Sequence, residues 1–224
     1  FRRKYKKKTN RRSKKSGAYR PKKATMYRVK GSSPFPDIVQ TRLHYSDYYV
    51  ASAVAGAVGS FDVSGNSVYR PYSGGHQPLG FDEYALLYNR YIVRGASIKL
   101  WFTQSTATPL DFQIALRSSG YATVETDFNQ VFERGKSVHR IVSKNAENIQ
   151  FLKSFITTKK AFALKKLDLS DDQYSAATTT NPTNEWYFAV SFQDLNETST
   201  VSMRFRFEVT YYVTFFQRKL LSAS

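Results

Sequence analysis

The sequence predicts an all-β protein: an eight-stranded antiparallel sandwich of the jelly-roll type, with short helices in loops and a basic N-terminal arm. Apolar and polar residues alternate with period two over several long segments, as they do in strands that bury one face. Clusters of Gly, Pro, Ser and Asn separate these segments and mark turns. No regular alternation of strands with helices is present, so we expect no parallel sheet. Eight antiparallel strands in one chain favour two packed sheets wound as a jelly roll.

The predicted strands differ in the strength of their pattern. In the last strand every odd position from Val201 to Phe215 is apolar, and the even positions between them are polar residues or Tyr212. Three earlier segments show the same alternation, and four more are weaker candidates. In chain order the eight predicted strands are residues 38–50, 66–69, 98–102, 110–116, 137–142, 149–158, 185–193 and 201–215. An aromatic content of 16% suits large side chains that fill the space between two sheets.

Two short helices are expected between the strands. Asp82 can cap the first helix, and its apolar stripe has helical spacing, formed by Tyr84, Leu87, Tyr88 and Tyr91. The second is predicted over residues 124–132. Residues 51–60 are mostly small, and six of the ten are Ala or Gly. We interpret them as a flexible loop or an irregular strand end, with a membrane-active peptide as the alternative.

Charge divides the chain into two predicted parts. Residues 1–30 hold fifteen of the 34 Lys and Arg residues and none of the 17 Asp and Glu residues. The remaining residues therefore hold nineteen basic and seventeen acidic groups, and the body is nearly neutral. We predict a disordered or extended polybasic arm over residues 1–34 and a jelly-roll shell domain over residues 35–224. Because the first residue is Phe1, we expect the native chain to begin upstream.

The arm is the predicted nucleic-acid site. Neutralising phosphates releases condensed counterions, a gain in free energy that needs no particular base sequence, and tyrosines between the charges can stack on unpaired bases. The predicted binding residues are Arg2, Arg3, Lys4, Tyr5, Lys6, Lys7, Lys8, Arg11, Arg12, Lys14, Lys15, Tyr19, Arg20, Lys22, Lys23, Tyr27, Arg28 and Lys30. A nuclear localisation signal is a compatible second use. An anionic membrane is the alternative partner, but the arm lacks the apolar face that an interfacial helix needs.

No motif in the sequence indicates catalysis, so we expect a protein that is not an enzyme and has no cofactor. The chain has no Cys, which removes disulfides and thiolate chemistry. Its three histidines, His44, His76 and His139, have no metal-ligand spacing. The one tight acidic cluster is Asp168, Asp171 and Asp172. We interpret this cluster as a solvated turn, with a Ca²⁺ site between subunits as the alternative.

One segment carries a resemblance to a known family. Residues 78–98 read Pro-Leu-Gly-Phe-Asp-Glu-Tyr-Ala-Leu-Leu-Tyr-Asn-Arg-Tyr-Ile-Val-Arg-Gly-Ala-Ser-Ile. This segment and the overall layout resemble capsid proteins of circular Rep-encoding single-stranded DNA viruses, the circovirus-like group. In that group Pro and Gly precede a short aromatic helix, and a strand follows, which we expect Gly95 to interrupt here. The arm departs from the resemblance because it carries more Lys than Arg, and Lys contacts phosphate as a point charge.

The resemblance implies a capsid protein that assembles into an icosahedral shell, most simply of sixty copies, and packages single-stranded DNA through the arm. It implies a place in the virion and, during assembly, in the host nucleus, reached through host import machinery; the host receptor is unknown. Three alternatives stay open: the coat protein of a small single-stranded RNA virus, a cellular β-sandwich nucleic-acid-binding protein, and a jelly-roll enzyme with clustered metal ligands.

Overall fold

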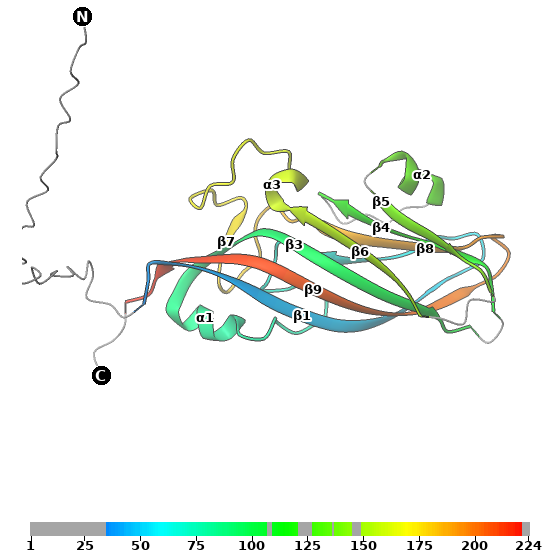
Figure 1. The fold of residues 1–224 in the computed structure, drawn as a ribbon, viewed down its shortest axis with the longest axis horizontal. Helices are drawn as coiled ribbons and strands as arrows, with labels where there is room; N and C mark the ends of the chain where they lie inside the picture. Colours follow the sequence, from blue (N-terminus) through cyan, green and yellow to red (C-terminus); the bar gives the residue numbers. More distant parts are fainter. Residues whose placement is uncertain (1–34, 107–108, 121–126, 136, 145–148, 221–224) are drawn as a thin grey trace, which may run out of the picture. The chain divides into compact units, whose positions relative to one another are not determined.

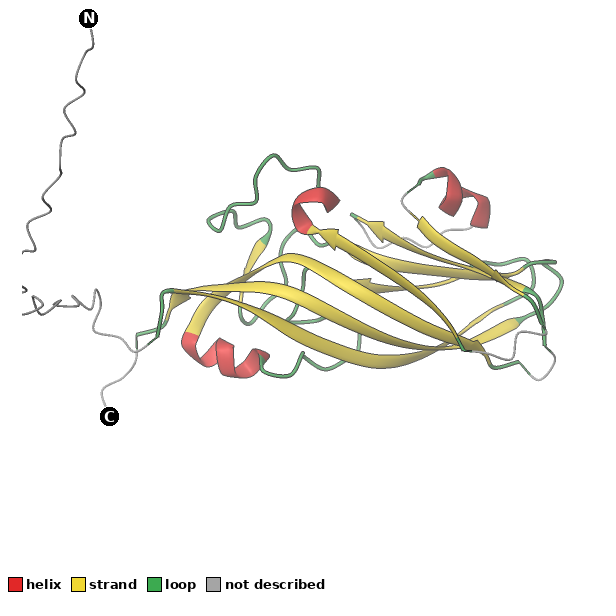
Figure 2. Cartoon of the chain, viewed as in Figure 1, coloured by secondary structure: helices red, strands yellow, loops and turns green. Residues whose placement is uncertain are grey.

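Nine strands form two antiparallel sheets in the residues that the computed structural model describes, which are 35–106, 109–120, 127–135, 137–144 and 149–220 (Figures 1 and 2). The five-stranded sheet contains β1 (Ile38–Ala53), β9 (Val201–Arg218), β3 (Tyr88–Gln104), β6 (Gln150–Thr157) and the short β7 (Ser175–Ala177). The four-stranded sheet contains β2 (Gly59–Ser64), β8 (Tyr187–Asp194), β4 (Phe112–Ser119) and β5 (Ser137–Val142). This arrangement confirms the predicted fold class.

The order of the strands is that of a jelly roll. The sheets read β1-β9-β3-β6 and β2-β8-β4-β5, and β7 pairs with β3 beyond the end of β6. The antiparallel pairs β1·β9, β2·β8, β3·β6 and β4·β5 therefore nest inside one another along the chain and alternate between the two sheets. Two sheets wound in this way are the double Greek key of a jelly roll. The ninth strand, β7, is an addition of three residues.

The core lies between the two sheets, as the alternation in the sequence predicts. The odd residues of β9 from Val201 to Phe215 are all buried. Aromatic rings from both sheets meet there, and Phe205 of β9 contacts Phe61 of β2 and Phe192 of β8, with ring centroids 4.9 and 5.3 Å apart. Such large inward side chains supply most of the apolar area that the two sheets bury against each other.

The structure corrects two predictions about strands. Residues 66–69 form no strand; Asn66 is buried, and its side-chain amide donates to the Asn184 carbonyl and accepts from the Trp186 N–H, both at 2.9 Å. The Asn66 side chain therefore makes the hydrogen bonds to residues 184–186 that a strand would make through its backbone. Residues 51–60, interpreted as a flexible loop or an irregular strand end, contain the end of β1 at Ala53 and the start of β2 at Gly59. Gly59 lies against the Phe192 ring, where a Cβ atom would approach within 2.4 Å, so packing requires a residue without a side chain.

Three short helices lie outside the strands (Figure 2). Helix α1 (Phe81–Leu87) begins after Gly80, whose φ of 87° is left-handed, and Asp82 lies in its first turn instead of capping it. The predicted stripe is only half helical, because Tyr88 and Tyr91 lie in β3, where they are buried. Tyr84 stacks on Phe215 with centroids 4.7 Å apart, so α1 packs on the edge of the core.

In each of the other two helices, the side chain of the residue before the helix caps its N-terminus. Helix α2 (Phe128–Glu133) follows Asp127, whose carboxylate accepts from the Asn129 N–H at 2.9 Å; residues 124–126 of the predicted helix lie outside the described residues. Helix α3 (Thr158–Ala161) is capped by Thr157. Among the helices of the described ranges, none has the length and apolar character needed to cross a membrane.

The predicted interruption of the strand at Gly95 is also corrected. β3 continues through it, with a shift in register between Val93 and Gly95 where it pairs with β9. A Cβ atom at Gly95 would lie 2.9 Å from the Ile156 carbonyl oxygen of β6. Glycine therefore allows the neighbouring strand to approach closely at the bulge, a common use of glycine in strands.

Candidate nucleic-acid interface

The arm predicted to bind nucleic acid, with all its residues from Arg2 to Lys30, lies outside the described residues, so its role stays a prediction. The structure does fix the segment that follows it. The Arg218 guanidinium donates to the Phe35 carbonyl at 2.7 Å and pairs with the Asp37 carboxylate at 3.3 Å. The Tyr88 hydroxyl donates to the Pro36 carbonyl at 2.8 Å. Residues 35–37 are therefore held at the end of β9 and the start of β3.

A second cationic surface lies in the body, on the outer face of the five-stranded sheet. Alternate residues of β1, β3, β6 and β9 point away from the core, and on this face they combine basic and aromatic side chains. We call this surface the basic-aromatic face. Its residues are Arg42, Lys99, Lys153, Arg204 and Arg206, with Tyr48, Trp101, Phe151, Phe155 and Tyr212.

One row of this face crosses four strands. In the register of the sheet, Tyr48 of β1 is opposite Arg206 of β9, Arg206 is opposite Trp101 of β3, and Trp101 is opposite Phe151 of β6. Directly opposite residues have Cβ atoms about 5 Å apart, so these side chains are neighbours. Tyr48 is 75% and Phe151 49% exposed. Large apolar rings thus face solvent beside a guanidinium group.

A second aromatic group lies farther along the same face. The rings of Phe155 and Tyr212 meet edge to face, with centroids 5.9 Å apart and planes at 84°, and the Arg42 guanidinium lies over the Tyr212 ring at 5.3 Å. In the register, Gly95 of β3 is opposite Tyr212. Because Gly95 has no side chain, rings from β9 and β6 can meet across β3.

The charge of the basic-aromatic face is strongly positive. We consider the outward positions of β1 from Arg42 to Ser52 and the outward positions of β9, β3 and β6 in register with them. These positions hold five cations and one carboxylate, Glu208. None of the five cations makes an ion pair with a carboxylate of the described residues. Lys99 and Lys153 are directly opposite each other in the ladder, an arrangement that destabilises a sheet. On its other side Lys99 is opposite Glu208 of β9, so one carboxylate offsets part of the charge. With five cations against this one carboxylate, the face keeps a net positive charge.

The face is also hollowed. A groove of about 340 Å³ is lined by Trp101, Ile149, Arg204, Arg206 and Glu208 among others. Guanidinium and ammonium groups bind phosphate or carboxylate oxygens, and exposed aromatic rings stack on planar groups. The arrangement suits a ligand that has negative charges and flat rings together.

The other end of the same outer face is covered by the chain. Ile92 of β3 and Phe216 of β9 are buried under an apolar cluster from the segment between α3 and β7. That cluster contains Tyr174 together with the partly buried Phe162, Leu164, Leu167 and Leu169. The exposed part of the face is therefore bounded on one side by a folded loop.

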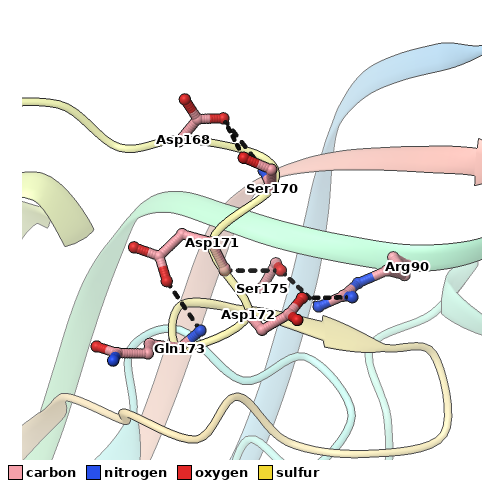
Figure 3. Close-up of polar contacts among 7 residues, drawn as sticks. All are labelled: Arg90, Asp168, Ser170, Asp171, Asp172, Gln173 and Ser175. Carbon is pink, nitrogen blue, oxygen red and sulfur yellow. Dashed lines mark hydrogen bonds and ion pairs between the residues drawn. The ribbon is translucent and has the colours of Figure 1, made fainter.

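This loop carries the acidic cluster, and its three carboxylates have separate partners (Figure 3). Asp168 accepts from the backbone N–H and hydroxyl of Ser170 at 3.1 and 3.0 Å. The Ser170 N–H, with help from Lys166, lowers the pKa of Asp168 to about 2. Asp171 accepts from the Gln173 N–H at 3.0 Å.

The third carboxylate, that of Asp172, pairs with Arg90 at 2.5 Å, and Arg90 also donates to the Ser175 hydroxyl at 2.7 Å. Figure 3 shows the three carboxylates directed to these different groups. They hold the shape of the loop and its contact with β3. Within the described residues no three His, Cys, Asp or Glu side chains are grouped to hold a metal ion.

The three histidines lie in different places. His44 is on the outer face of the five-stranded sheet and shares a hydrogen bond with Thr210 at 3.1 Å. His76 lies against the Tyr45 ring at 4.8 Å, and His139 meets Phe132 edge to face at 4.8 Å. Each has a local structural contact.

A second hollow, about 530 Å³ in volume, lies beside β2 and is lined by Asp62, Arg70, Glu185 and Tyr187 among others. Burial raises the pKa of Glu185, which accepts a hydrogen bond from the Ser64 hydroxyl at 2.9 Å. Burial, and then the nearby Glu185 and Asp62, raise the pKa of Tyr187 to about 12. This hollow is polar and has mixed charge, so it lacks the positive field of the basic-aromatic face.

The alternation over residues 201–215 predicts outward positions for Arg204 and Arg206 but does not indicate the rest of the basic-aromatic face. The available signal was the unusual outward positions of two strands, where Lys99 alternates with Trp101, and Lys153 lies between Phe151 and Phe155. Outward aromatic residues in a half-buried strand are a sign of contact with a ligand or partner. Their placement in one row required the register.

Comparison of the sequence with protein-family models and with curated proteins finds no match. Comparison of the structure finds chains of similar topology. The BFDV capsid protein in a 60-mer crystal structure is 13% identical, with a TM-score of 0.45 over 85% of this chain and 100% of the other. A chain of the empty head of Turnip Yellow Mosaic Virus is 6% identical, with a TM-score of 0.44 over 91% and 94%.

A chain of the semi-empty virus-like particle of the nodavirus of the giant freshwater prawn Macrobrachium rosenbergii is 13% identical, with a TM-score of 0.43 over 96% and 100%. These identities and TM-scores are too low to assign a family. The fold class rests instead on the order and pairing of the strands in this chain.

Proposed function

We propose that this chain is a viral capsid protein whose copies assemble into a closed shell around a single-stranded nucleic-acid genome. The observation that carries the proposal is the joining of a jelly-roll body to an arm that holds fifteen cations and no acids. A nearly neutral body can pack against its own copies without strong repulsion. The arm concentrates the charge needed to neutralise phosphate.

Exposed apolar side chains support contacts between copies. Leu79 and Leu86, beside and within α1, are 90% and 74% exposed, and Val138 and Ile141 of β5 are 43% and 61% exposed. β5 is an edge strand of the four-stranded sheet, and edge strands are either protected or paired. Apolar residues at an end and at an edge of the sandwich fit contacts that close into a symmetric shell.

The finer parts of the proposal rest on the resemblance of residues 78–98 to circovirus-like capsid proteins. It favours DNA over RNA as the genome, sixty copies in the shell, and assembly in the host nucleus after import through the arm. The structure gives that segment a physical role, because α1 packs on the core through Tyr84 and the following residues enter β3. The proposed function involves no catalysis and no cofactor.

The test is assembly and packaging in the full chain. We expect size-exclusion chromatography and electron microscopy to find closed particles of megadalton mass, and extracted nucleic acid to be degraded by deoxyribonuclease. Removal of residues 2–30 should leave particles or folded subunits that contain much less nucleic acid. Extracted nucleic acid that ribonuclease degrades would show that the genome is RNA and not DNA. A protein that stays monomeric would refute the capsid proposal and favour a cellular nucleic-acid-binding protein.

A further inference from the structure

We propose that the basic-aromatic face is a second nucleic-acid site, which binds single-stranded segments by stacking unpaired bases on Trp101 and its neighbours. The inference rests on the proposed function and assigns part of the work to the body of the protein. The arm binds phosphates, whereas this face also binds exposed bases. The face therefore distinguishes single strands from duplexes.

The geometry provides alternating positions for bases and phosphates. Alternate residues of a strand are about 6.6 Å apart, so the row through Trp101 and Phe151 lies one such step from the row through Lys99 and Lys153. On its other side Arg204 is opposite Thr103. Aromatic rings are thus flanked by cations in both directions along the strands. A nucleotide, with a flat base and a charged phosphate, fits neighbouring rows of this kind.

The electrostatics indicate a polyanion. Lys99 is opposite Glu208 of β9 on one side but opposite Lys153 of β6 on the other, and like charges in that position destabilise a sheet. Arg204 and Arg206 project from the same side of β9, and none of the four has an ion-pair partner among the described carboxylates. A bound phosphate backbone relieves this repulsion. A second copy of the same face would increase it, because like-charged surfaces would be apposed.

The rings of this face, of which Tyr48 and Phe151 are exposed and Trp101 is half-buried, select single strands. In a duplex the bases are stacked and paired, so Trp101, Tyr48 and Phe151 would meet only the backbone. Bases in a single strand have free faces, and stacking on an aromatic side chain is tolerant of base identity. The groove lined by Trp101, Arg204 and Arg206 gives such a base a place beside a guanidinium group.

The chain supplies its own optical probe. It has two tryptophans: Trp101 on the face, and Trp186, which is fully buried and donates to the Thr158 hydroxyl at 3.1 Å. A base that stacks on Trp101 quenches its fluorescence and leaves that of Trp186 unchanged. The difference between the wild-type chain and W101F is therefore the signal of Trp101 alone.

The experiment uses the full chain, stripped of bound nucleic acid in high salt, with oligo(dT) and with polyphosphate, which has charge but no bases. We expect oligo(dT) to quench the wild-type fluorescence, W101F to lose that quenching while still binding, and polyphosphate to cause none. W101A should lower the affinity for oligo(dT) at least fivefold. The loss should be clearest at raised salt, where the contribution of the arm is smaller.

Charge variants complete the design. K99Q/K153Q should weaken the binding of oligo(dT), whereas the matched control K159Q/K165Q should not, because these exposed lysines lie in α3 and the loop after it and are not residues of the face. Tight binding of oligo(dT), measured by anisotropy, with no quenching of Trp101 and no loss in W101A would overturn this inference and leave the arm as the only site. Failure of the wild-type chain to bind oligo(dT) even at low salt would overturn the packaging proposal as well.

Discussion

The outer faces of the two sheets are built from the same alternation and yet differ in every property that matters for binding. The five-stranded sheet exposes cations and rings along β9 and its neighbours. On the central strands of the four-stranded sheet, most outward residues are small or neutral, as at Ala115, Ala189 and Ser191, and these are buried. The cation on this side of β4, Arg117, is opposite Ala189 and is buried as well. Phe128 and Val131 of α2 pack on Ala115. One face is covered by the chain itself, and the other is left open.

Aromatic residues are therefore exposed on only part of the surface of this protein. The chain has the means to cover a sheet, since α2 does so on one side and the loop before β7 does so on part of the other. Rings such as Tyr48 and Phe155 remain 75% and 59% exposed. Contiguous exposed apolar surface on a soluble domain commonly marks a site of interaction.

The largest expected effect is a difference in stability between a substitution on the inner face of β9 and one on its outer face. F205A should lower the free energy of unfolding by about 3–5 kcal/mol, because it leaves a cavity between Phe61 and Phe192. Its neighbour R206A should change it by less than about 0.5 kcal/mol. Urea denaturation of both variants measures the two values. Similar losses in both would mean that Arg206 is structural and that the contrast between the faces is misplaced.

The next effect concerns the cover of the four-stranded sheet. D127A removes the side chain that caps α2, and we expect a loss of about 1 kcal/mol in stability. Hydrogen exchange should rise in α2. T157A, which removes the cap of α3, is the matched control and should leave exchange in α2 unchanged. Unaltered protection of α2 in D127A would show that packing on Ala115 holds the helix without its cap.

A smaller effect tests whether the cations of the basic-aromatic face lower the stability of the protein while they raise its affinity for nucleic acid. K153E places opposite charges at the Lys99 position of the ladder, so stability should rise by about 0.2–1 kcal/mol. Affinity for oligo(dT) should fall at the same time. K159E, at an exposed helical lysine, should produce neither change. A variant that is more stable and binds equally well would remove the argument from charge repulsion.

The smallest effect is a pH dependence that belongs to the other hollow. Burial raises the pKa of Glu185 in the folded state above its ordinary value of 4.5, so the folded state holds this proton more tightly than the unfolded state does. The stabilisation is present below pH 4.5 and is lost as pH rises through the folded pKa. The free energy of unfolding of E185Q should therefore fall less between pH 4.5 and 7. Equal slopes in the two proteins would place the titration elsewhere.

Regular alternation made much of the fold predictable from the sequence. The buried set of β9 agrees with the pattern, because one side of that strand meets the core and the other side does not. The bounds of β5 also agree with the prediction, although four of its six residues are exposed. β2 was missed because Gly59 packs on a ring of a residue more than a hundred positions away. β7 has only three residues, too few for a period, and was missed for that reason.

The candidate site was less predictable. The arm follows from composition alone and remains a prediction. The basic-aromatic face depends on pairs such as Trp101 with Phe151, which come from strands fifty residues apart. Charge and aromaticity at single positions did not indicate that these side chains form one row. Only the register of the sheet relates them.

The pairing of β1 with β9 has a consequence for synthesis on the ribosome. β9 lies between β1 and β3 in its sheet, so the first strand to be made has no neighbour in that sheet until the last strand has been made. A nascent chain that ends before Val201 leaves β1 without its partner along its whole length. The five-stranded sheet is therefore complete only after β9 has been translated, although many domains fold as they emerge. Chains that terminate before β9 cannot complete this sheet.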